Sequence, residues 1–136
     1  MRGRAWIVGI LCIGVLFTTA CATAPPKTTT LDQFAGTTWA GEWGSDSPGH
    51  GMRSPVRLKI DQADLGAIKG TMTITSARGR DHAFPASGLV ETKDGATWLR
   101  LTVEGNRTFE LRFTGSTLEG RGKSAIHEGP VTLRLE

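Results

Sequence analysis

Two kinds of side chain in this 136-residue chain could carry chemistry: a cysteine near the amino terminus and three histidines. Cys21 follows two arginines, an apolar run over residues 5–17 and the small residues 18–20. This order is typical of an export signal, and a cysteine directly behind it offers a thiol for lipid attachment. We therefore predict a signal peptide over residues 1–20 and lipidation at Cys21.

The three histidines, His50, His82 and His127, each have an acidic residue nearby in the sequence. Such groups could assemble an acid–base or metal site. Their spacing matches no metal-ligand pattern, and all three fall in or near predicted loops, which favours solvated side chains. We expect no catalytic residue, no metal ion and no cofactor. A small enzyme that uses loop histidines and carboxylates is the alternative.

The apolar run of the predicted signal is too short for a permanent membrane span. As a helix, its thirteen residues would reach roughly 20 Å, against a hydrocarbon core of about 30 Å. Thr18-Thr19-Ala20-Cys21 resembles the lipobox of bacterial lipoproteins, in which the cysteine is acylated, with palmitate for example, and becomes the first mature residue. The resemblance implies a cell-envelope protein. Ala22 in place of aspartate implies the outer membrane, with the protein facing the periplasm. Ordinary cleavage after Ala22, giving a secreted protein, is the alternative.

The residues behind Cys21 predict a tether. Residues 21–35 are rich in proline and threonine and cannot bury much apolar surface. Removal of the signal also removes Cys12, so no disulfide can form within the mature chain. The mature chain then has 14 basic and 13 acidic residues. This near-balance of charge does not indicate a positive electrostatic potential strong enough to attract nucleic acid. The membrane is therefore the expected partner of this segment, through the lipid.

Residues 36–136 predict a single all-β domain, because apolar and polar residues alternate with period two. The apolar members of the five clearest runs are Val56, Leu58 and Ile60; Ile68, Met72 and Ile74; Leu99, Leu101 and Val103; Phe109, Leu111 and Phe113; and Val131, Leu133 and Leu135. Segments 37–44, 83–90 and 117–123 bring the number to about eight strands, most of seven or eight residues.

Short Gly-containing turns between the strands favour an antiparallel up-and-down barrel, with a β-sandwich as the alternative. Pro85 belongs at a bulge or an edge. The charged outward face predicts a soluble barrel rather than a membrane-spanning one.

Thr38-Trp39-Ala40-Gly41-Glu42-Trp43-Gly44, followed by Lys69-Gly70-Thr71, resembles the opening of lipocalin-type and avidin-type small barrels. The chain has no tyrosine, so biotin binding does not carry over from the avidins. An eight-stranded barrel holds one small ligand or is filled by side chains. The candidate pocket residues are Trp39, Trp43, Met72, Leu101 and Phe109. The alternative is that the tryptophans pack over inward glycines such as Gly70, Gly120 and Gly122.

These expectations combine into one functional hypothesis. The chain is a non-enzymatic, lipid-anchored envelope protein whose barrel binds a partner or a small apolar ligand. A structural envelope protein with a packed core is the other non-enzymatic possibility.

Overall fold

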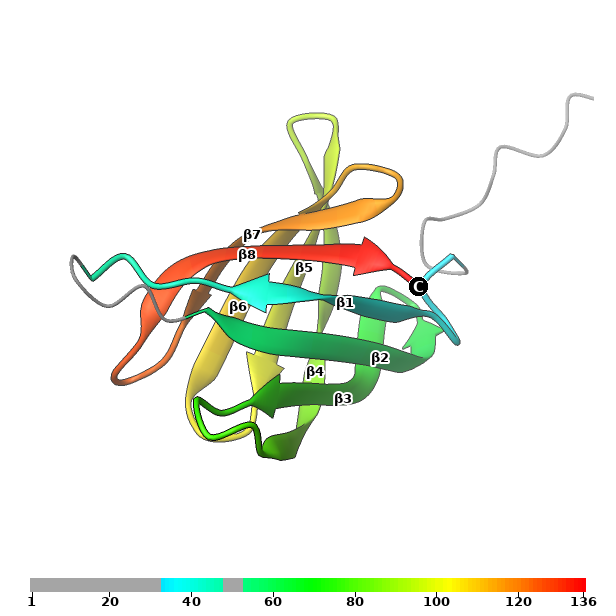
Figure 1. The fold of residues 1–136 in the computed structure, drawn as a ribbon. Helices are drawn as coiled ribbons and strands as arrows, with labels where there is room; N and C mark the ends of the chain where they lie inside the picture. Colours follow the sequence, from blue (N-terminus) through cyan, green and yellow to red (C-terminus); the bar gives the residue numbers. More distant parts are fainter. Residues whose placement is uncertain (1–32, 48–52) are drawn as a thin grey trace, which may run out of the picture.

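The computed structural model describes residues 33–47 and 53–136, which form a closed barrel of eight antiparallel strands (Figure 1). The strands are β1 (Thr38–Trp43), β2 (Ser54–Asp64), β3 (Ala67–Thr75), β4 (Asp81–Lys93), β5 (Ala96–Val103), β6 (Arg107–Phe113), β7 (Thr117–Lys123) and β8 (Glu128–Leu135). Each strand pairs with the next in the sequence, and β1 closes the barrel against β8. The predicted up-and-down barrel is confirmed, and the sandwich alternative is wrong. Within these residues, no helix is long and apolar enough to cross a membrane. The predicted signal, Cys21 and His50 lie outside the described residues.

The alternation of apolar and polar residues along each strand gives the barrel an inner face and an outer face. The buried residues are almost all the apolar members of the alternating runs, and they form one core cluster. Their charged neighbours along the strands are exposed, including Arg57, Arg100 and Arg134. Several of these charges pair across strands, and the Arg100 guanidinium lies 3.8 Å from Glu91 and 3.5 Å from Glu110. The interior is therefore apolar and the outer face is charged, as the alternation predicts.

The strand lengths correct one expectation. Most strands were expected to have seven or eight residues, but β2, β3 and β4 have 11, 9 and 13. Residues near the strand ends lack a buried face, so the apolar alternation that marks a strand stops before the pairing does. The ladder between β3 and β4 begins at Thr75 and Asp81, where both residues are polar.

Pro85 lies inside β4 in continuous register with β3, without a bulge. On the other side of β4 the pairing with β5 starts only at Ala86, so Pro85 occupies a local edge. Its carbonyl accepts a bond of 3.1 Å from the amide of Glu104, just past the end of β5. The nitrogen of Pro85 has no hydrogen to donate. The carbonyl of Glu104 instead accepts a 2.5 Å bond from Arg107 Nη1. The edge position expected for Pro85 is thus confirmed, and its missing N–H removes no ladder bond.

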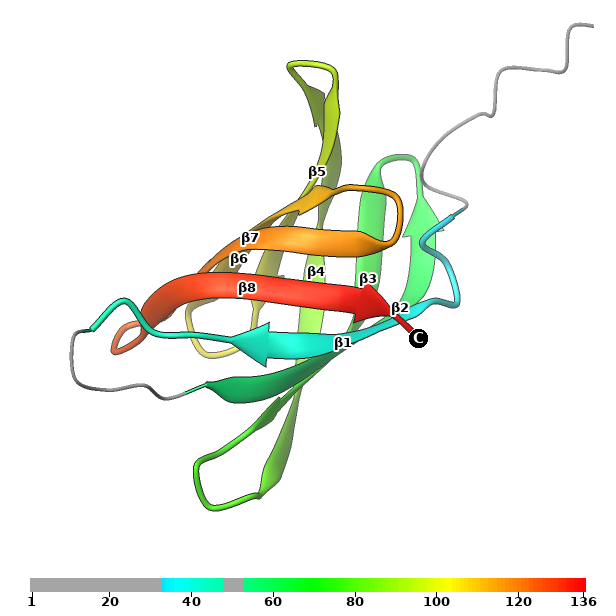
Figure 2. The same cartoon turned by 45° about the horizontal axis from the view of Figure 1, so that its top comes forward.

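The barrel has two ends that differ in what they carry (Figures 1 and 2). We call the N-terminal end the one at which residues 33–37 enter and where turns 65–66, 94–95 and 114–116 lie. The far end carries the β1–β2 connection and the loops 76–80, 104–106 and 124–127. In both views residues 33–37 and the β2–β3 turn lie on the same side of the molecule.

Phe34 closes the N-terminal end, although the sequence places it in the predicted tether that ends at residue 35. Its side chain is fully buried, with its ring 5.1 Å from that of Phe113 and 6.1 Å from that of Trp39. The Thr37 hydroxyl donates a 2.6 Å bond to the Phe34 carbonyl, and the Gly36 amide donates one of 2.8 Å to Ile60. An isolated aromatic residue before the first strand has no periodic partners, so the alternation could not assign it to the core.

Candidate functional site

The five candidate pocket residues all lie in the core. Met72 and Phe109 are 0% exposed, Trp39 and Leu101 are 1% exposed, and Trp43 is 4% exposed. A water-sized void inside the barrel would leave the side chains that border it accessible to a probe of that size. Their near-zero accessibility therefore indicates that they touch one another and their neighbours. The geometry favours the packed-core alternative over an internal pocket.

Gly122 shows directly how the space beneath the aromatic rings is used. A Cβ atom at this position would lie 2.6 Å from Phe109 Cδ1 and 2.9 Å from Trp43 Nε1. Real Cβ atoms do not approach carbon or nitrogen so closely, so the two rings already occupy the volume that the glycine leaves open. At this position the geometry fits the alternative in which a tryptophan packs over an inward glycine.

Gly70 and Gly120 have a different role from Gly122. A Cβ on Gly70 would overlap the carbonyl oxygen of Lys59 on β2, and one on Gly120 would overlap that of Glu110 on β6. These glycines let neighbouring backbones approach closely where the sheet curls into a barrel. Neither glycine opens a cavity.

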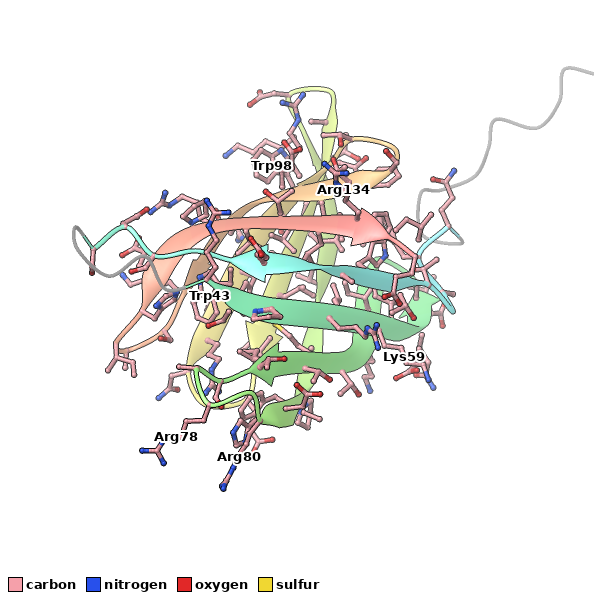
Figure 3. The ribbon with its side chains drawn as sticks, in the orientation of Figure 1. Trp43, Lys59, Arg78, Arg80, Trp98 and Arg134 are labelled. Carbon is pink, nitrogen blue, oxygen red and sulfur yellow. The ribbon has the colours of Figure 1, made fainter. Side chains whose placement is uncertain are left out.

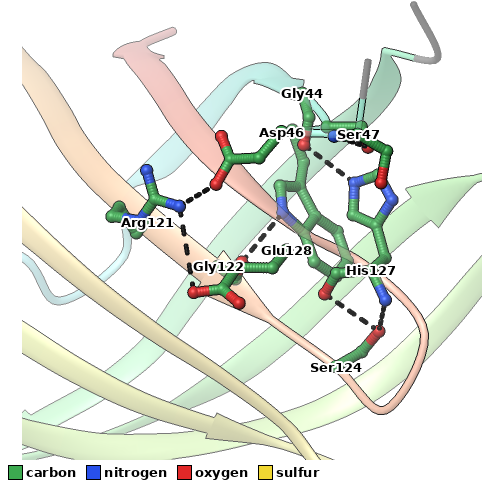
Figure 4. A network of polar contacts seen from close by, with 10 residues as sticks. Gly44, Asp46, Ser47, Arg121, Gly122, Ser124, His127 and Glu128 are labelled. Carbon is green, nitrogen blue, oxygen red and sulfur yellow. Dashed lines mark hydrogen bonds and ion pairs between the residues drawn. The ribbon is translucent and has the colours of Figure 1, made fainter. Parts of the chain in front are cut away.

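The far end of the barrel is closed by a second aromatic group. The Trp43 ring meets Phe109 edge-on at 5.0 Å and His127 at 4.4 Å, and its Nε1 donates a 3.3 Å bond to the Gly122 carbonyl. His127 Nε2 lies 2.8 Å from the carbonyl oxygen of Gly44 (Figure 4). Because a carbonyl only accepts, this nitrogen carries the proton. His127 thus serves as a hydrogen-bonded lid on Trp43.

Polar contacts around this lid join the loops of the far end (Figure 4). Arg121 pairs with Asp46 after β1, and its Nη2 lies 3.8 Å from Glu128 at the start of β8. The Ser124 hydroxyl accepts a 3.0 Å bond from the amide of His127. These side chains are about half exposed, so their pairing positions the loops more than it stabilises the fold.

The histidines do not share a site in the part of the chain that the structure describes. His82 is exposed and stacks on Phe84 at 6.4 Å, whereas His127 packs on Trp43. Within residues 33–47 and 53–136, no three His, Cys, Asp or Glu side chains are grouped so as to hold a metal ion. The structure gives His127 a structural role and leaves His82 exposed to solvent.

The most unusual surface feature is apolar, and the sequence predictions did not single it out. Leu65, Ala67, Leu89 and Trp98 lie on the outside of β2–β5 near the N-terminal end, and we call them the apolar strip. Leu65 is 95% exposed and Leu89 is 51% exposed, and Ala67 and Leu89 are direct partners across β3 and β4. Trp98 alternates with the buried Leu99 on β5 and lies half-buried on the outer face (Figure 3). The signal that could have found the strip is a leucine in a turn where Asn or Asp is usual.

A shallow hollow adjoins the strip beside Trp98. It has a volume of about 60 Å³ and is lined by Trp98 and the charged residues Glu91, Lys93, Arg100 and Glu110, together with Leu99. This volume holds no more than a small chemical group. The strip is therefore a surface for contact rather than a pocket for a metabolite.

No protein-family model matches the chain, and no curated protein matches it either.

Proposed function

We propose that this chain is a lipid-anchored protein of the bacterial cell envelope, held by Cys21, whose barrel binds another macromolecule through its outer surface. The pattern in residues 1–21 supports the anchor. The filled interior supports a surface partner over a small apolar ligand, because the candidate pocket side chains are at most 4% exposed. This filled interior is the single observation that carries the proposal.

The two ends of the barrel differ in their distance from the proposed anchor, which indicates how the barrel is oriented relative to the membrane. The described chain begins at residue 33 beside Phe34, which is fixed in the N-terminal end of the barrel. A tether that enters at this end keeps it toward the lipid, and the loops of the far end then project away from the anchoring membrane. The proposed partner-binding surface includes those loops, which carry the exposed side chains of Arg78 and Arg80 on the β3–β4 hairpin (Figure 3).

Cys21→Ser should abolish membrane association or block maturation, because serine has no thiol to which the lipid could be attached. The measurement is fractionation of cells that express the wild-type or the variant chain, with a wash at high salt. Cys12→Ser is the matched control, since that residue lies inside the predicted signal and should leave the distribution unchanged. Equal membrane association of wild type and Cys21→Ser would reject lipidation at Cys21 as the anchor.

The choice between a surface partner and an internal ligand has its own experiment. The Cys21→Ser protein, released in soluble form, should give the mass of the bare polypeptide in native mass spectrometry. We expect this result because packed side chains leave the interior no room for a bound lipid or metabolite. A stoichiometric co-purified small molecule, released on denaturation, would instead establish the internal-ligand function.

A further inference from the structure

The β2–β3 turn contains a residue that its geometry does not favour. Leu65 has a φ of 49° and Gly66 one of 86°, so both central residues of this two-residue turn are left-handed. Asn, Asp and Gly tolerate this conformation best, and a bulky aliphatic residue is uncommon in it. The chain uses Asp94 with Gly95 and Asn106 with Gly105 at its other left-handed pairs. Leu65 is the exception.

Exposure makes the choice of leucine more unusual. The Leu65 side chain is 95% exposed, so it contributes almost no burial to the folded barrel. Backbone geometry and side-chain burial would both be served as well or better by asparagine. Folding stability alone therefore does not account for Leu65, and an exposed apolar side chain in such a turn is a candidate for a contact outside the barrel.

Leu65 does not stand alone, because it continues into the rest of the apolar strip. The amide of Val90 donates a 2.7 Å bond to the carbonyl of Gly66, which fixes the turn against β4. Ala67 then pairs with Leu89, and Leu89 pairs with Arg100, the residue two positions after Trp98 on β5. Trp98 itself pairs with Glu91 on β4, so it is a diagonal neighbour of Leu89, and the ion pair between Glu91 and Arg100 lies beside them.

The strip lies at the end of the barrel that is nearest the proposed anchor. It lies toward the end of the barrel where residue 33 enters, and eleven residues, 22–32, separate that entry from Cys21. Even at an extended rise of about 3.1 Å per residue, eleven residues span no more than roughly 34 Å, which keeps the strip within reach of a bilayer that holds Cys21. Tethering at such a distance corresponds to an effective concentration on the order of millimolar, so a weak contact suffices.

We propose that the apolar strip rests on the membrane that holds the lipid anchor, with Leu65 inserted at the boundary between headgroups and acyl chains. This inference rests on the proposed lipidation at Cys21. Trp98 suits the interfacial region, because its ring is apolar and its N–H can reach water or headgroups. Charged residues also lie near the strip. Lys69, Lys93 and Arg100 are balanced by Asp64, Glu91 and Asp94, and Arg100 pairs with Glu91, so the contact does not depend on a net charge.

Docking of this kind would orient the domain. With the strip against the lipid, the barrel has one side and one end toward the membrane, and the far-end loops face away. Burial of a single leucine side chain favours the docked state by roughly ten- to a hundred-fold, which is enough for a domain already tethered nearby.

Tryptophan fluorescence provides the test, because the mature chain has only Trp39, Trp43 and Trp98. Trp39 and Trp43 are buried in the core, so quenching from the bilayer reports on Trp98. The full-length lipidated protein is reconstituted in vesicles of phosphatidylethanolamine and phosphatidylglycerol, with and without brominated acyl chains. We expect quenching of the wild type at low and at high ionic strength, and its loss in Trp98→Phe.

Two leucine-sized side chains at opposite ends provide matched variants. Leu65→Asn should reduce the docked fraction several-fold while the fold is kept, because asparagine suits the positive φ. Ile126→Asn removes a side chain that is 97% exposed in the β7–β8 loop at the far end, and it should leave the quenching unchanged. Circular dichroism of both variants verifies that the barrel is intact.

The outcomes separate this inference from the function on which it rests. Failure of the wild-type protein to float with vesicles overturns both the lipid anchor and the docking. Flotation without quenching of Trp98 overturns the docking alone and leaves the anchor in place. Equal effects of Leu65→Asn and Ile126→Asn on quenching would likewise reject the strip as the contact.

Discussion

Phe34→Ala should lower the free energy of unfolding by about 3–5 kcal/mol, the usual cost of removing a fully buried phenylalanine. The ring is 0% exposed and lies against Trp39 and Phe113, so truncation leaves a cavity at the N-terminal end of the barrel. A domain of this size loses roughly 4–8 °C of melting temperature for each kcal/mol, so we expect a fall of at least about 12 °C. Urea and thermal unfolding of the Cys21→Ser protein, followed by circular dichroism, measure both quantities.

The neighbouring Gln33 gives the control for this prediction. Its side chain is exposed, so Gln33→Ala should change the free energy of unfolding by less than about 0.5 kcal/mol. Equal stability of the two variants would show that Phe34 belongs to the tether and that the barrel closes without it.

Gly122→Leu should destabilise the barrel by about 3 kcal/mol or prevent folding altogether. The first added carbon alone would overlap the Phe109 ring and lie 2.9 Å from Trp43 Nε1, and leucine adds three more carbons. Overpacking of a filled core costs typically about 1–3 kcal/mol, and this site has rings on more than one side. The shift of the Trp43 ring would also lengthen its bond to the Gly122 carbonyl. Denaturant unfolding gives the cost, and Gly122→Ala gives a smaller change of the same sign if leucine does not fold.

Gly44→Ala is the matched control, because a Cβ there would meet Pro130 at an ordinary 3.4 Å and the φ is not left-handed. It should be close to neutral. The pair also bears on function, since a ligand cavity beneath Trp43 and Phe109 would accept the larger side chain. A Gly122→Leu protein as stable as the wild type would therefore revive the internal-pocket hypothesis.

The packed interior of the barrel and the exposed apolar strip both place the proposed function on the outer surface. Aromatic rings close both ends: Phe34 with Trp39 and Phe113 at one end, and Trp43 with Phe109 and His127 at the other. Such a domain has little room to change shape inside. The function that we propose therefore uses the outer face and loops, with Leu65 and Trp98 toward lipid and the exposed Arg78 and Arg80 toward a partner.

The sequence by itself determined the class of fold, because alternation along a strand is a local property. Val56, Leu58 and Ile60 face inward with charged residues between them, four later runs repeat the pattern, and the turns delimit the remaining three of the eight strands. The turn residues at 94–95 and 105–106 carried enough conformational information to place the connections. The candidate pocket residues were likewise predicted to face inward, since each belongs to an alternating run.

What only the tertiary structure decided depends on contacts between residues far apart in the chain. Whether Trp43 lines a pocket or fills the core depends on Phe109, Gly122 and His127, which lie more than sixty positions later. Phe34 enters the core through contacts with Phe113, and no local pattern marks it. Leu65 looked like an ordinary turn residue until its exposure and positive φ showed that the fold makes no use of its side chain. Packing volume and the solvent exposure of a turn are properties of the closed barrel, so they could not be read from period-two alternation.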